Sequence, residues 1–440
     1  MTYSAAIQWL YDLQLFGAKL GLENPRKLAE LAGNPQERLR FIHVAGTNGK
    51  GSTCAMLDSV YRTAGLKVGL FTSPHLISFR ERIRINGEMI SEDGLIREVE
   101  GMQALLKEFP GPHHPTFFEV VVALALNWFA RNECDLVIWE TGLGGRLDAT
   151  NIVVPLASVI TNVSLDHQQW LGETVIEIAR EKAGVIKPGV PVFTAAEDPD
   201  ALAVIRNAAE AAGAPFTPTT GEPGAARQLP STDIRTGQRT ALQNPSLSGP
   251  HQRLNAQLAA TVVAGLQDAI PVDATTLATG LRDARMDGRF QKIQSATGGT
   301  LILDGAHNEA GVDALLATLT EQFPTEAPTF VLGMLDDKAW AGMCVRLARA
   351  AARIILAPVA SARSADANAL AKACREANPE IEVTVSDTPA SALEAAADQP
   401  LVVATGSLHY LGEVMEALGS DIATEIDERA LNEYRAEGDN

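Results

Sequence analysis

The sequence has little cysteine and no arrangement of cysteines that points to a function. Only four occur among the 440 residues, and they are widely spaced: Cys54, Cys134, Cys344 and Cys374, with no CxxC pair and no spacing typical of metal ligands. Cysteines of this kind are usually small buried side chains in a reducing compartment. The sequence therefore argues against a disulfide-rich secreted scaffold and against a cysteine-based metal centre.

Long apolar runs are also lacking, and none is long enough to span a membrane. Residues 1–17 have no basic region and no cleavage site, so they do not form a signal peptide. Ile7, Leu10, Leu13 and Phe16 recur at helical spacing instead and predict an amphipathic first helix. We expect a cytoplasmic protein without a membrane partner.

Basic residues are outnumbered, since 36 Lys and Arg stand against 54 Asp and Glu and the formal charge is -18. Nucleic acids are bound through Lys/Arg surfaces, so this balance argues against nucleic acid as the main partner, although a nucleotide site needs only a few local groups. The length and the hydrophobic share of 46% are typical of a globular protein with two or three domains. We expect a monomer that acts on small molecules.

Short apolar runs alternate with helical patterns from residue 41 onward. The strands predicted in the first half are Phe41–Ala45, Lys67–Phe71, Leu136–Glu140, Leu156–Thr161 and Val190–Thr194. The helical patterns include Ser52–Ala64, Phe117–Arg131, Glu173–Ala183, Leu254–Leu266 and Asp273–Arg285. This alternation predicts that residues 1–287 form a P-loop-type α/β domain, a mostly parallel sheet with helices on both faces. Residues 213–250 are rich in Pro, Gly, Ser and Thr and predict loops with a few short strands.

A second alternation begins near residue 299. Its predicted strands are Leu301–Asp304, Thr329–Gly333, Ile354–Ala357, Glu382–Val385 and Leu401–Thr405. Each is followed by an Ala-rich helical pattern, so residues 288–440 are predicted to form a smaller, Rossmann-like α/β domain. The acidic residues 421–440 are predicted to form a solvated helical tail.

A glycine-rich turn lies between the first predicted strand and the helical pattern after it. The turn reads Gly46-Thr47-Asn48-Gly49-Lys50-Gly51-Ser52. In such a turn, backbone N–H groups and a helix N-terminus face an anion, the lysine reaches terminal phosphates and the serine hydroxyl suits Mg²⁺. The common pattern GxxxxGK[ST] fits imperfectly, because Val44 replaces its first glycine and Gly51 separates the lysine from the hydroxyl.

This variant loop resembles that of the Mur-type ligases and is typical of the folylpolyglutamate synthase/dihydrofolate synthase family. Further segments similar to that family follow in the expected order: Ser73–Leu76, Glu81–Gly87, Thr116–Glu119, Glu140–Asn151, Ser164–His167, Glu181–Gly184, Asp287–Gln291, Leu303–Asn308 and Gly406–Leu408. Asp287 and Glu309 depart from the family, which usually has proline at both places. These departures concern turn geometry more than chemistry.

The resemblance implies an ATP-dependent ligase that uses ATP and two Mg²⁺ ions to convert a carboxylate into an acyl phosphate and to join it to the amine of L-glutamate. The implied ATP contacts are Gly46, Thr47, Asn48, Gly49, Lys50, Gly51, Ser52, Asn255, Arg289, Asp304 and His307. The implied metal ligands are Ser52, Glu119, His167 and, once carbamylated, Lys182. The implied catalytic residues are Lys50, His167 and Lys182, and the implied pteroate-binding residues are Leu20, Gly21 and Leu22.

Residue types alone leave plainer roles open at several of these positions. His167 suits a buried structural histidine, Lys182 a cation at a helix C-terminus, and Asp304 a strand-end helix cap. The Lys19–Glu23 stretch also suits a helix-terminating turn. The resemblance favours the functional roles of His167 and Lys182.

Other functions share the phosphate loop. A cell-wall Mur ligase normally adds an N-terminal domain for a UDP-sugar, whereas only residues 1–40 precede the first predicted strand here. A regulatory P-loop NTPase would need no acceptor amine. Within the favoured family, the expected reaction adds L-glutamate to dihydropteroate, to folate polyglutamates or to both, and a folylpolyglutamate synthase alone is the alternative.

Overall fold

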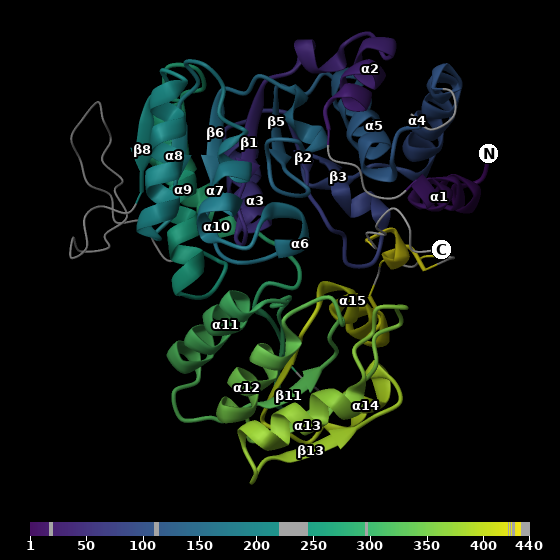
Figure 1. Cartoon of the computed structure of the whole chain (residues 1–440), viewed down its shortest axis with the longest axis vertical. Helices are drawn as coiled ribbons and strands as arrows, with labels where there is room; N and C mark the ends of the chain where they lie inside the picture. Colours follow the sequence, from purple (N-terminus) through teal and green to yellow (C-terminus); the bar gives the residue numbers. More distant parts are fainter. Residues whose placement is uncertain are drawn as a thin grey trace.

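The computed structural model describes residues 1–16, 21–109, 114–219, 245–294, 298–420, 422, 424 and 427–432. Two lobes, each built on its own sheet, lie one above the other (Figure 1). The upper lobe contains the described residues as far as Asp283, and the lower lobe contains those from Gln291 to Ala417. Within the described residues, no helix has the length and the apolar character that crossing a membrane requires.

The first sheet has eight strands in the order β4-β3-β2-β5-β1-β6-β7-β8. The strands are β1 Phe41–Ala45, β2 Val68–Phe71, β3 Ile83–Ile85, β4 Glu88–Met89, β5 Leu136–Glu140, β6 Ala157–Ile160, β7 Val192–Thr194 and β8 Phe216–Pro218. All neighbours from β2 to β8 are parallel, and β3 and β4 add an antiparallel edge. The carboxyl ends of the central strands therefore meet at one edge of the sheet.

Alternate residues of these strands face two separate cores, as the two-residue period of a strand requires. Phe41, Phe71 and Trp139 pack with helices α1, α2, α4 and α5, whereas Ile42 and Ile138 pack with α3, α9 and α10. The helices of this domain are α1 Tyr3–Asp12, α2 Glu23–Leu31, α3 Lys50–Thr63, α4 Glu92–Leu105, α5 Phe117–Arg131, α6 Gln168–Leu171, α7 Val175–Ala183, α8 Pro199–Ala211, α9 Pro250–Gly265 and α10 Ala274–Asp283.

The second sheet has six strands in the order β13-β12-β11-β14-β10-β9. The strands are β9 Gln291–Gln294, β10 Thr300–Leu303, β11 Thr329–Leu332, β12 Arg353–Leu356, β13 Glu382–Val385 and β14 Leu401–Thr405. The helices are α11 Glu309–Gln322, α12 Trp340–Ala350, α13 Ala367–Ala377, α14 Pro389–Ala395 and α15 Leu408–Ala417. Only β9 is antiparallel to its neighbour among the described strands, so the second domain is also a mostly parallel α/β layer structure.

The predicted fold class is confirmed, because two α/β domains with mostly parallel sheets are present. The predicted first helix corresponds to α1 and the 3-10 turn Leu13–Phe16, with Ile7, Leu10 and Leu13 buried. The predicted boundary, between residues 287 and 288, lies in the connection from α10 to β9 and stays a prediction.

The prediction of a solvated tail is wrong for residues 427–432. Residues Arg429–Asn432 form a short 3-10 helix, η7, which packs against the first domain rather than into solvent. Glu428 and Leu431 are fully buried there. Net charge indicated a solvated segment. It does not show that buried hydrogen-bond donors of the first domain bind a carboxylate such as that of Glu428.

Candidate active site

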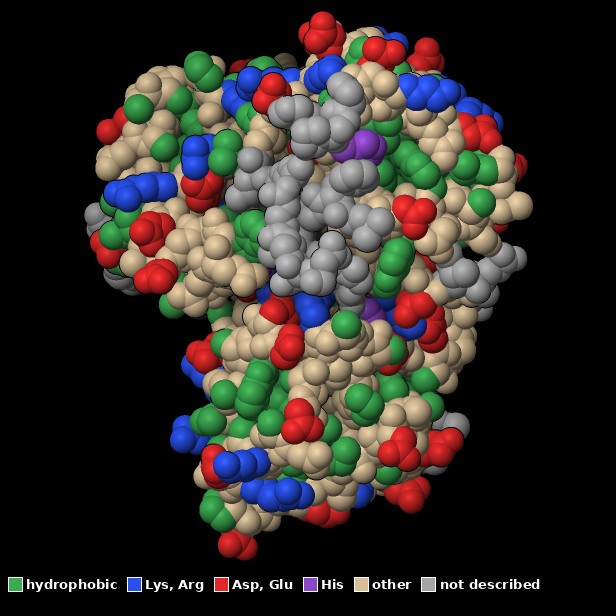
Figure 2. Space-filling model, turned by 45° about the vertical axis from the view of Figure 1, so that its right-hand side comes forward, with side chains coloured by type: hydrophobic (Ala, Val, Ile, Leu, Met, Phe, Trp, Pro, Cys, Tyr) green, Lys and Arg blue, Asp and Glu red, His purple; other side chains and the backbone are tan. Residues whose placement is uncertain are grey.

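A cavity of about 440 Å³ lies between the two lobes. It opens at the carboxyl ends of β1 and β5 in the first domain, and residues that follow β10, β11 and β14 complete its walls from the second domain. Figure 2 shows the waist between the lobes, where Lys, Arg and His side chains come to the surface. A site shared by two domains is a common arrangement for binding small ligands.

The glycine-rich turn connects β1 directly to α3 and forms one wall of the cavity. Gly46 has φ +150°, and a Cβ there would collide with the side chain of Thr161. Gly49 has φ +82° and occupies the N-cap of α3, where among the described residues no side chain caps the helix. The N–H groups of the first turn of α3 are therefore left to an anion in the cavity.

The turn is held in shape by the segment that follows β6. The backbone N–H of Asn48 donates to Asn162 Oδ1 at 2.8 Å, and Thr161 Oγ1 donates to the carbonyl of Asn48 at 2.7 Å. Thr47 Oγ1 donates to the carbonyl of Ser164 at 3.1 Å and accepts from its N–H at 3.1 Å. These bonds fix the backbone of the turn before any ligand binds, which lowers the entropy cost of binding.

Two lysines converge on one carbonyl of this turn. The Lys50 ammonium donates to the carbonyls of Gly46 and Thr47, both at 3.1 Å, and the Lys182 ammonium donates to the carbonyl of Gly46 at 2.8 Å. Lys182 comes from the end of α7 and is only 3% exposed. Burial, with Lys50 nearby, lowers the pKa of Lys182 to about 7, so a large fraction of this amine is neutral at physiological pH.

Glu140 ends β5 and brings a carboxylate into the same cavity. It accepts the backbone N–H of Ser73 at 3.0 Å, and burial raises its pKa to about 7 although Lys50 counteracts the shift. The preceding residue, Trp139, is fully buried against Phe71 with ring centroids 4.5 Å apart, and its indole N–H donates to the carbonyl of Thr150 at 3.0 Å. This packing anchors the strand end and hence the position of Glu140.

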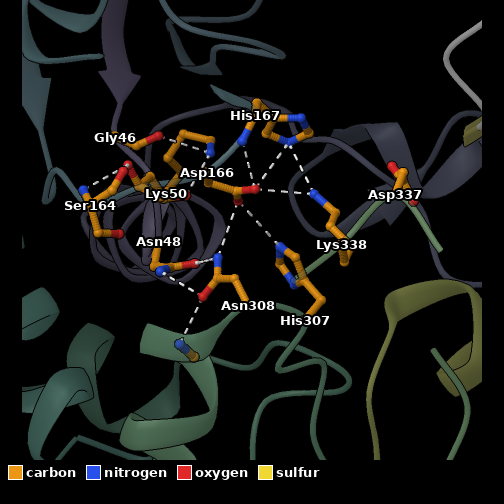
Figure 3. Close-up of polar contacts among 12 residues, drawn as sticks. Gly46, Asn48, Lys50, Ser164, Asp166, His167, His307, Asn308, Asp337 and Lys338 are labelled. Carbon is orange, nitrogen blue, oxygen red and sulfur yellow. Dashed lines mark hydrogen bonds and ion pairs between the residues drawn. The ribbon is translucent and has the colours of Figure 1, made fainter. Parts of the chain in front are cut away.

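Asp166 is the centre of a polar network that joins the two domains (Figure 3). Its carboxylate pairs with Lys338 Nζ at 3.2 Å, accepts from Asn308 Nδ2 at 3.1 Å and lies 3.9 Å from the Nε2 atoms of His167 and His307. Burial alone would raise the pKa of Asp166, but Lys338 and the two imidazoles lower it below its usual value. Burial, with Lys338 nearby, lowers the pKa of both histidines to about 4, which leaves them neutral at pH 7.

The domains make a second polar contact next to this network. Asn48 of the glycine-rich turn and Asn308 at the start of α11 exchange side-chain hydrogen bonds of 3.3 and 3.1 Å (Figure 3). Asn308 also accepts the N–H of Gly311 at 2.8 Å and so caps α11. The glycine-rich turn of the first domain is thus in direct contact with the start of α11 in the second domain.

Most of the residues that sequence predicts for the site are brought together. Those that line the cavity are Gly46, Thr47, Asn48, Gly49, Lys50, Gly51, Ser52, His167, Lys182, Arg289 and His307. Asn255 and Asp304 lie just behind the wall: Asn255 faces Gly49, and Asp304 accepts the N–H groups of Phe290 and Ala306. Asp304 therefore holds the loops that carry Arg289 and His307.

Glu119 is not among the residues that line the cavity, and its role as a metal ligand stays a prediction. Its carboxylate accepts the N–H of Thr116 at 2.7 Å and belongs to the capping box at the start of α5. Of the residues predicted for the pteroate, Gly21 and Leu22 are also outside the cavity wall, and Gly21 donates to the carbonyl of Leu147 at 3.2 Å. Leu20 lies outside the described residues.

Sequence reasoning did not assign several cavity-wall residues to the site, among them Ser73, Arg82, Glu140, Asp166 and Lys338. Glu140 had a usable signal, since it ends a buried strand immediately before a glycine-rich turn. Arg82 and Lys338 had no such signal in the sequence, because a lone charge in a loop does not show which cavity it faces.

Within the described part of the chain, no group of three or more His, Cys, Asp and Glu side chains is close enough to hold a metal, so any metal donor set here includes other residue types.

Comparison with known proteins agrees with this geometry. Residues 44–263 match the Mur ligase middle domain, and residues 288–408 match the Mur ligase glutamate ligase domain. A dihydrofolate synthase/folylpolyglutamate synthase of Bacillus subtilis is 36% identical over 436 residues, which cover 94% of this chain and 99% of that protein.

Solved structures with the same two-domain arrangement are also similar to this chain. A folylpolyglutamate synthase from Thermotoga maritima has a TM-score of 0.82 and 33% identity, covering 97% of this chain and 98% of that one. Escherichia coli FolC in complex with DHPP and ADP has a TM-score of 0.81 and 29% identity, covering 95% and 98%. The chain therefore belongs to the Mur ligase family, in its dihydrofolate synthase/folylpolyglutamate synthase branch, and is an ATP-dependent ligase.

Proposed function

We propose that this ligase joins L-glutamate to both dihydropteroate and reduced folates in one active site. The observation that carries the proposal is the shared cavity, in which a phosphate loop, Glu140, His167 and Lys182 of one domain face Arg289 and His307 of the other. Among the described residues there is one such loop and one such set of partners. Two separate catalytic centres are therefore not expected.

The reaction has two chemical steps. A carboxylate oxygen of the acceptor attacks the γ-phosphorus of ATP, the bond to ADP breaks, and an acyl phosphate forms. The amine of glutamate then attacks the acyl carbon and releases phosphate. The first step spreads negative charge over the transferring group, so cations and N–H donors fixed around it lower the barrier.

The residues of the first domain suit that task. The uncapped first turn of α3 and the Lys50 ammonium would hold the β- and γ-phosphates. Arg289 and His307 would hold the nucleotide from the second domain. Closing the two domains over the site keeps water from hydrolysing the acyl phosphate and holds the amine close to the acyl carbon.

Ser52 and Glu140 would supply hard oxygen donors for Mg²⁺, and neutral His167 a nitrogen donor. Bound Mg²⁺ would neutralise charge on the phosphates. An ammonium cannot ligate a metal, but the neutral amine of Lys182 can react with CO₂ to give a carbamate and a proton, and the carbamate oxygens would complete the donor set. Glu140 replaces Glu119 in this proposed metal site, because Glu140 lies in the cavity wall.

Product analysis with dihydropteroate and tetrahydrofolate as parallel acceptors tests the proposal. Both should yield glutamylated products and ADP, and dihydropteroate should inhibit glutamate addition to tetrahydrofolate because the two compete for one cavity. Folate extension without any use of dihydropteroate would leave the narrower function, a folylpolyglutamate synthase alone. ATP hydrolysis that is indifferent to both acceptors and to glutamate would contradict a ligase.

A further inference from the structure

The chain returns to the first domain after it has completed the second. Residues 427–432, which we call the C-terminal strap, follow α15 and lie against the first domain (Figure 1). Glu428 of the strap is fully buried, and its carboxylate accepts from Tyr3 Oη at 2.9 Å, Ser78 Oγ at 3.1 Å and the N–H of Phe79 at 2.5 Å. A buried carboxylate is costly unless it is bonded in this way, so the docking is specific.

The strap also bonds to His75, and the bonds define the tautomer of that histidine. His75 Nδ1 lies 2.8 Å from Arg82 Nε, and His75 Nε2 lies 2.8 Å from the carbonyl oxygen of Glu428. A guanidinium only donates and a carbonyl only accepts. Nδ1 therefore carries the lone pair and Nε2 the proton, which is the neutral ring that its complete burial favours.

Asn432 holds Arg82 from a second direction. Its side-chain oxygen accepts from Arg82 Nη2 at 2.6 Å, and its amide donates to the carbonyl of His75 at 2.9 Å. The third constraint is the ring of Phe117, whose centroid lies 5.7 Å from the guanidinium carbon. Arg82 is thereby fixed in one orientation, and both Arg82 and Asn432 line the cavity that contains Glu140.

We propose that the C-terminal strap is a positioning element of the active site. Asn432 orients the Arg82 guanidinium directly, and the carbonyl of Glu428 orients it through His75. In the cavity wall, the guanidinium then binds a carboxylate or phosphoryl group of a substrate. This inference rests on the ligation proposed above. Residues near the end of the chain thus complete a site whose phosphate loop lies near its beginning.

Asn432→Ala is the direct test, because it removes one bond to a charged group and leaves the buried Glu428 in place. We expect kcat/KM to fall about tenfold, the usual effect of losing a hydrogen bond to a charged partner. KM is measured separately for ATP, glutamate and the acceptor, and the substrate with the largest rise identifies the anionic group that Arg82 takes. Asn432→Asp keeps the accepting oxygen but loses the amide that donates to His75, so it should recover only part of the loss.

Glu416→Ala is the matched control. Glu416 on α15 pairs with Arg429 of the strap at 2.8 Å and does not touch Arg82 or His75. It should leave kcat/KM unchanged, and the melting temperatures of the two variants measure how much stability each of them loses. Equal kcat/KM losses in the two variants would show that the strap acts only through stability and would overturn the proposal.

A double-mutant cycle with Arg82→Ala separates positioning from general structural damage. If Asn432 acts through Arg82, Asn432→Ala should cause no further loss once Arg82 is alanine. Independent, additive losses would refute the proposed role. An inactive wild type would instead refute the ligation on which the inference rests, whereas an active wild type matched by Asn432→Ala would refute the strap alone.

Discussion

The helices α3 and α11, one from each domain, begin close to the contact between Asn48 and Asn308, and their first turns differ. At the start of α3 the N-cap is Gly49, and no described side chain bonds the N–H groups that follow. At the start of α11 the N-cap is Asn308, whose side chain accepts the N–H of Gly311 at 2.8 Å. One helix end thus keeps its donors for a ligand, and the other satisfies a donor internally.

The difference assigns separate tasks to the two domains. An uncapped helix N-terminus attracts anions through its N–H groups and its dipole, which supports the proposal that the phosphates bind at α3. The capped end of α11 is instead a contact surface, because Asn308 also bonds Asn48 and Asp166 of the first domain. The proposed phosphate contacts at Gly49 and Lys50 are therefore on different residues from the domain contact of Asn308, and substitutions should separate the two roles.

The largest effect is expected at the first residue of α3. Lys50→Ala should lower kcat for ligation by at least about a hundredfold, since it removes a fixed cation from the transferring phosphoryl group. The fold should survive, because the ammonium bonds only loop carbonyls. Steady-state kinetics and thermal melts measure both quantities.

Glu309→Ala, at the first residue of α11, is the equivalent change at the other helix. Glu309 pairs with Arg346 at 2.9 Å and is 43% exposed, so ligation should continue at the wild-type rate. Near-normal turnover by Lys50→Ala would contradict the placement of the phosphates at α3.

The next largest effect is expected at Lys182. Lys182→Ala should lose about a hundredfold in kcat, because the carbamate oxygens proposed to complete the Mg²⁺ donor set are gone, and a short-chain carboxylate should restore part of it. Burial lowers the pKa of Lys182 to about 7, so the reactive neutral amine becomes the main form as pH rises through 7. Enzyme depleted of CO₂ should therefore regain activity faster at pH 8 than at pH 6 when both samples receive the same concentration of dissolved CO₂.

Lys50→Ala serves as the control for that rescue, since a carboxylate cannot replace a cation. Activity that is indifferent to bicarbonate depletion would show that Lys182 acts as an amine and not as a carbamate.

A smaller effect should separate the two candidate metal ligands. Glu140→Gln should raise the Mg²⁺ concentration for half-maximal activity about tenfold, because it removes a charged oxygen donor from the cavity. Glu119→Gln should leave that concentration unchanged and change stability little, because the glutamine oxygen can still accept the Thr116 N–H of the capping box. Titrations of activity with Mg²⁺ and denaturant unfolding measure the two effects.

Glu140 also gives the Mg²⁺ requirement a pH dependence. Burial raises its pKa to about 7, so the carboxylate is protonated as pH falls below 7 and apparent Mg²⁺ affinity should fall with it. This dependence should be lost in Glu140→Gln. An unchanged Mg²⁺ requirement in that variant would return Glu119 to consideration.

The sequence predicted the parts of the fold that depend on regular patterns. Buried parallel strands such as β1 and β5 are short apolar runs, and both were predicted with the ends that the structure has. The edge strand β9 was missed because its residues alternate between exposed and half-buried positions and its apolar content is low. The strand pair β3 and β4 was too short to give a period.

The site was predictable where one loop carries it and less so where tertiary contacts assemble it. The turn from Gly46 to Ser52 is contiguous, so its residues were named together. Glu119 and Glu140 are both carboxylates in segments similar to the family, and only their placement distinguishes the capping residue from the cavity residue. Lys338 bonds Asp166 although the two residues are 172 positions apart in the sequence, and no local pattern indicates a contact over that separation.

The smallest expected effect concerns that ion pair. Lys338→Ala removes the cation from Asp166, and the side chains of both residues are mostly buried, 14% and 10% exposed. We expect kcat to fall about threefold, because a partly screened ion pair contributes little free energy and its loss lets the domains close less firmly. Asp166→Asn combined with Lys338→Ala should lower kcat no further than the more severe single variant does, since both substitutions break one contact.

Lys372→Ala is the control: it breaks an exposed pair with Glu376 at 3.8 Å on α13 and should leave kcat unchanged. A Lys338→Ala enzyme as fast as Lys372→Ala, with unchanged KM for ATP, would show that the capped end of α11 suffices to join the domains.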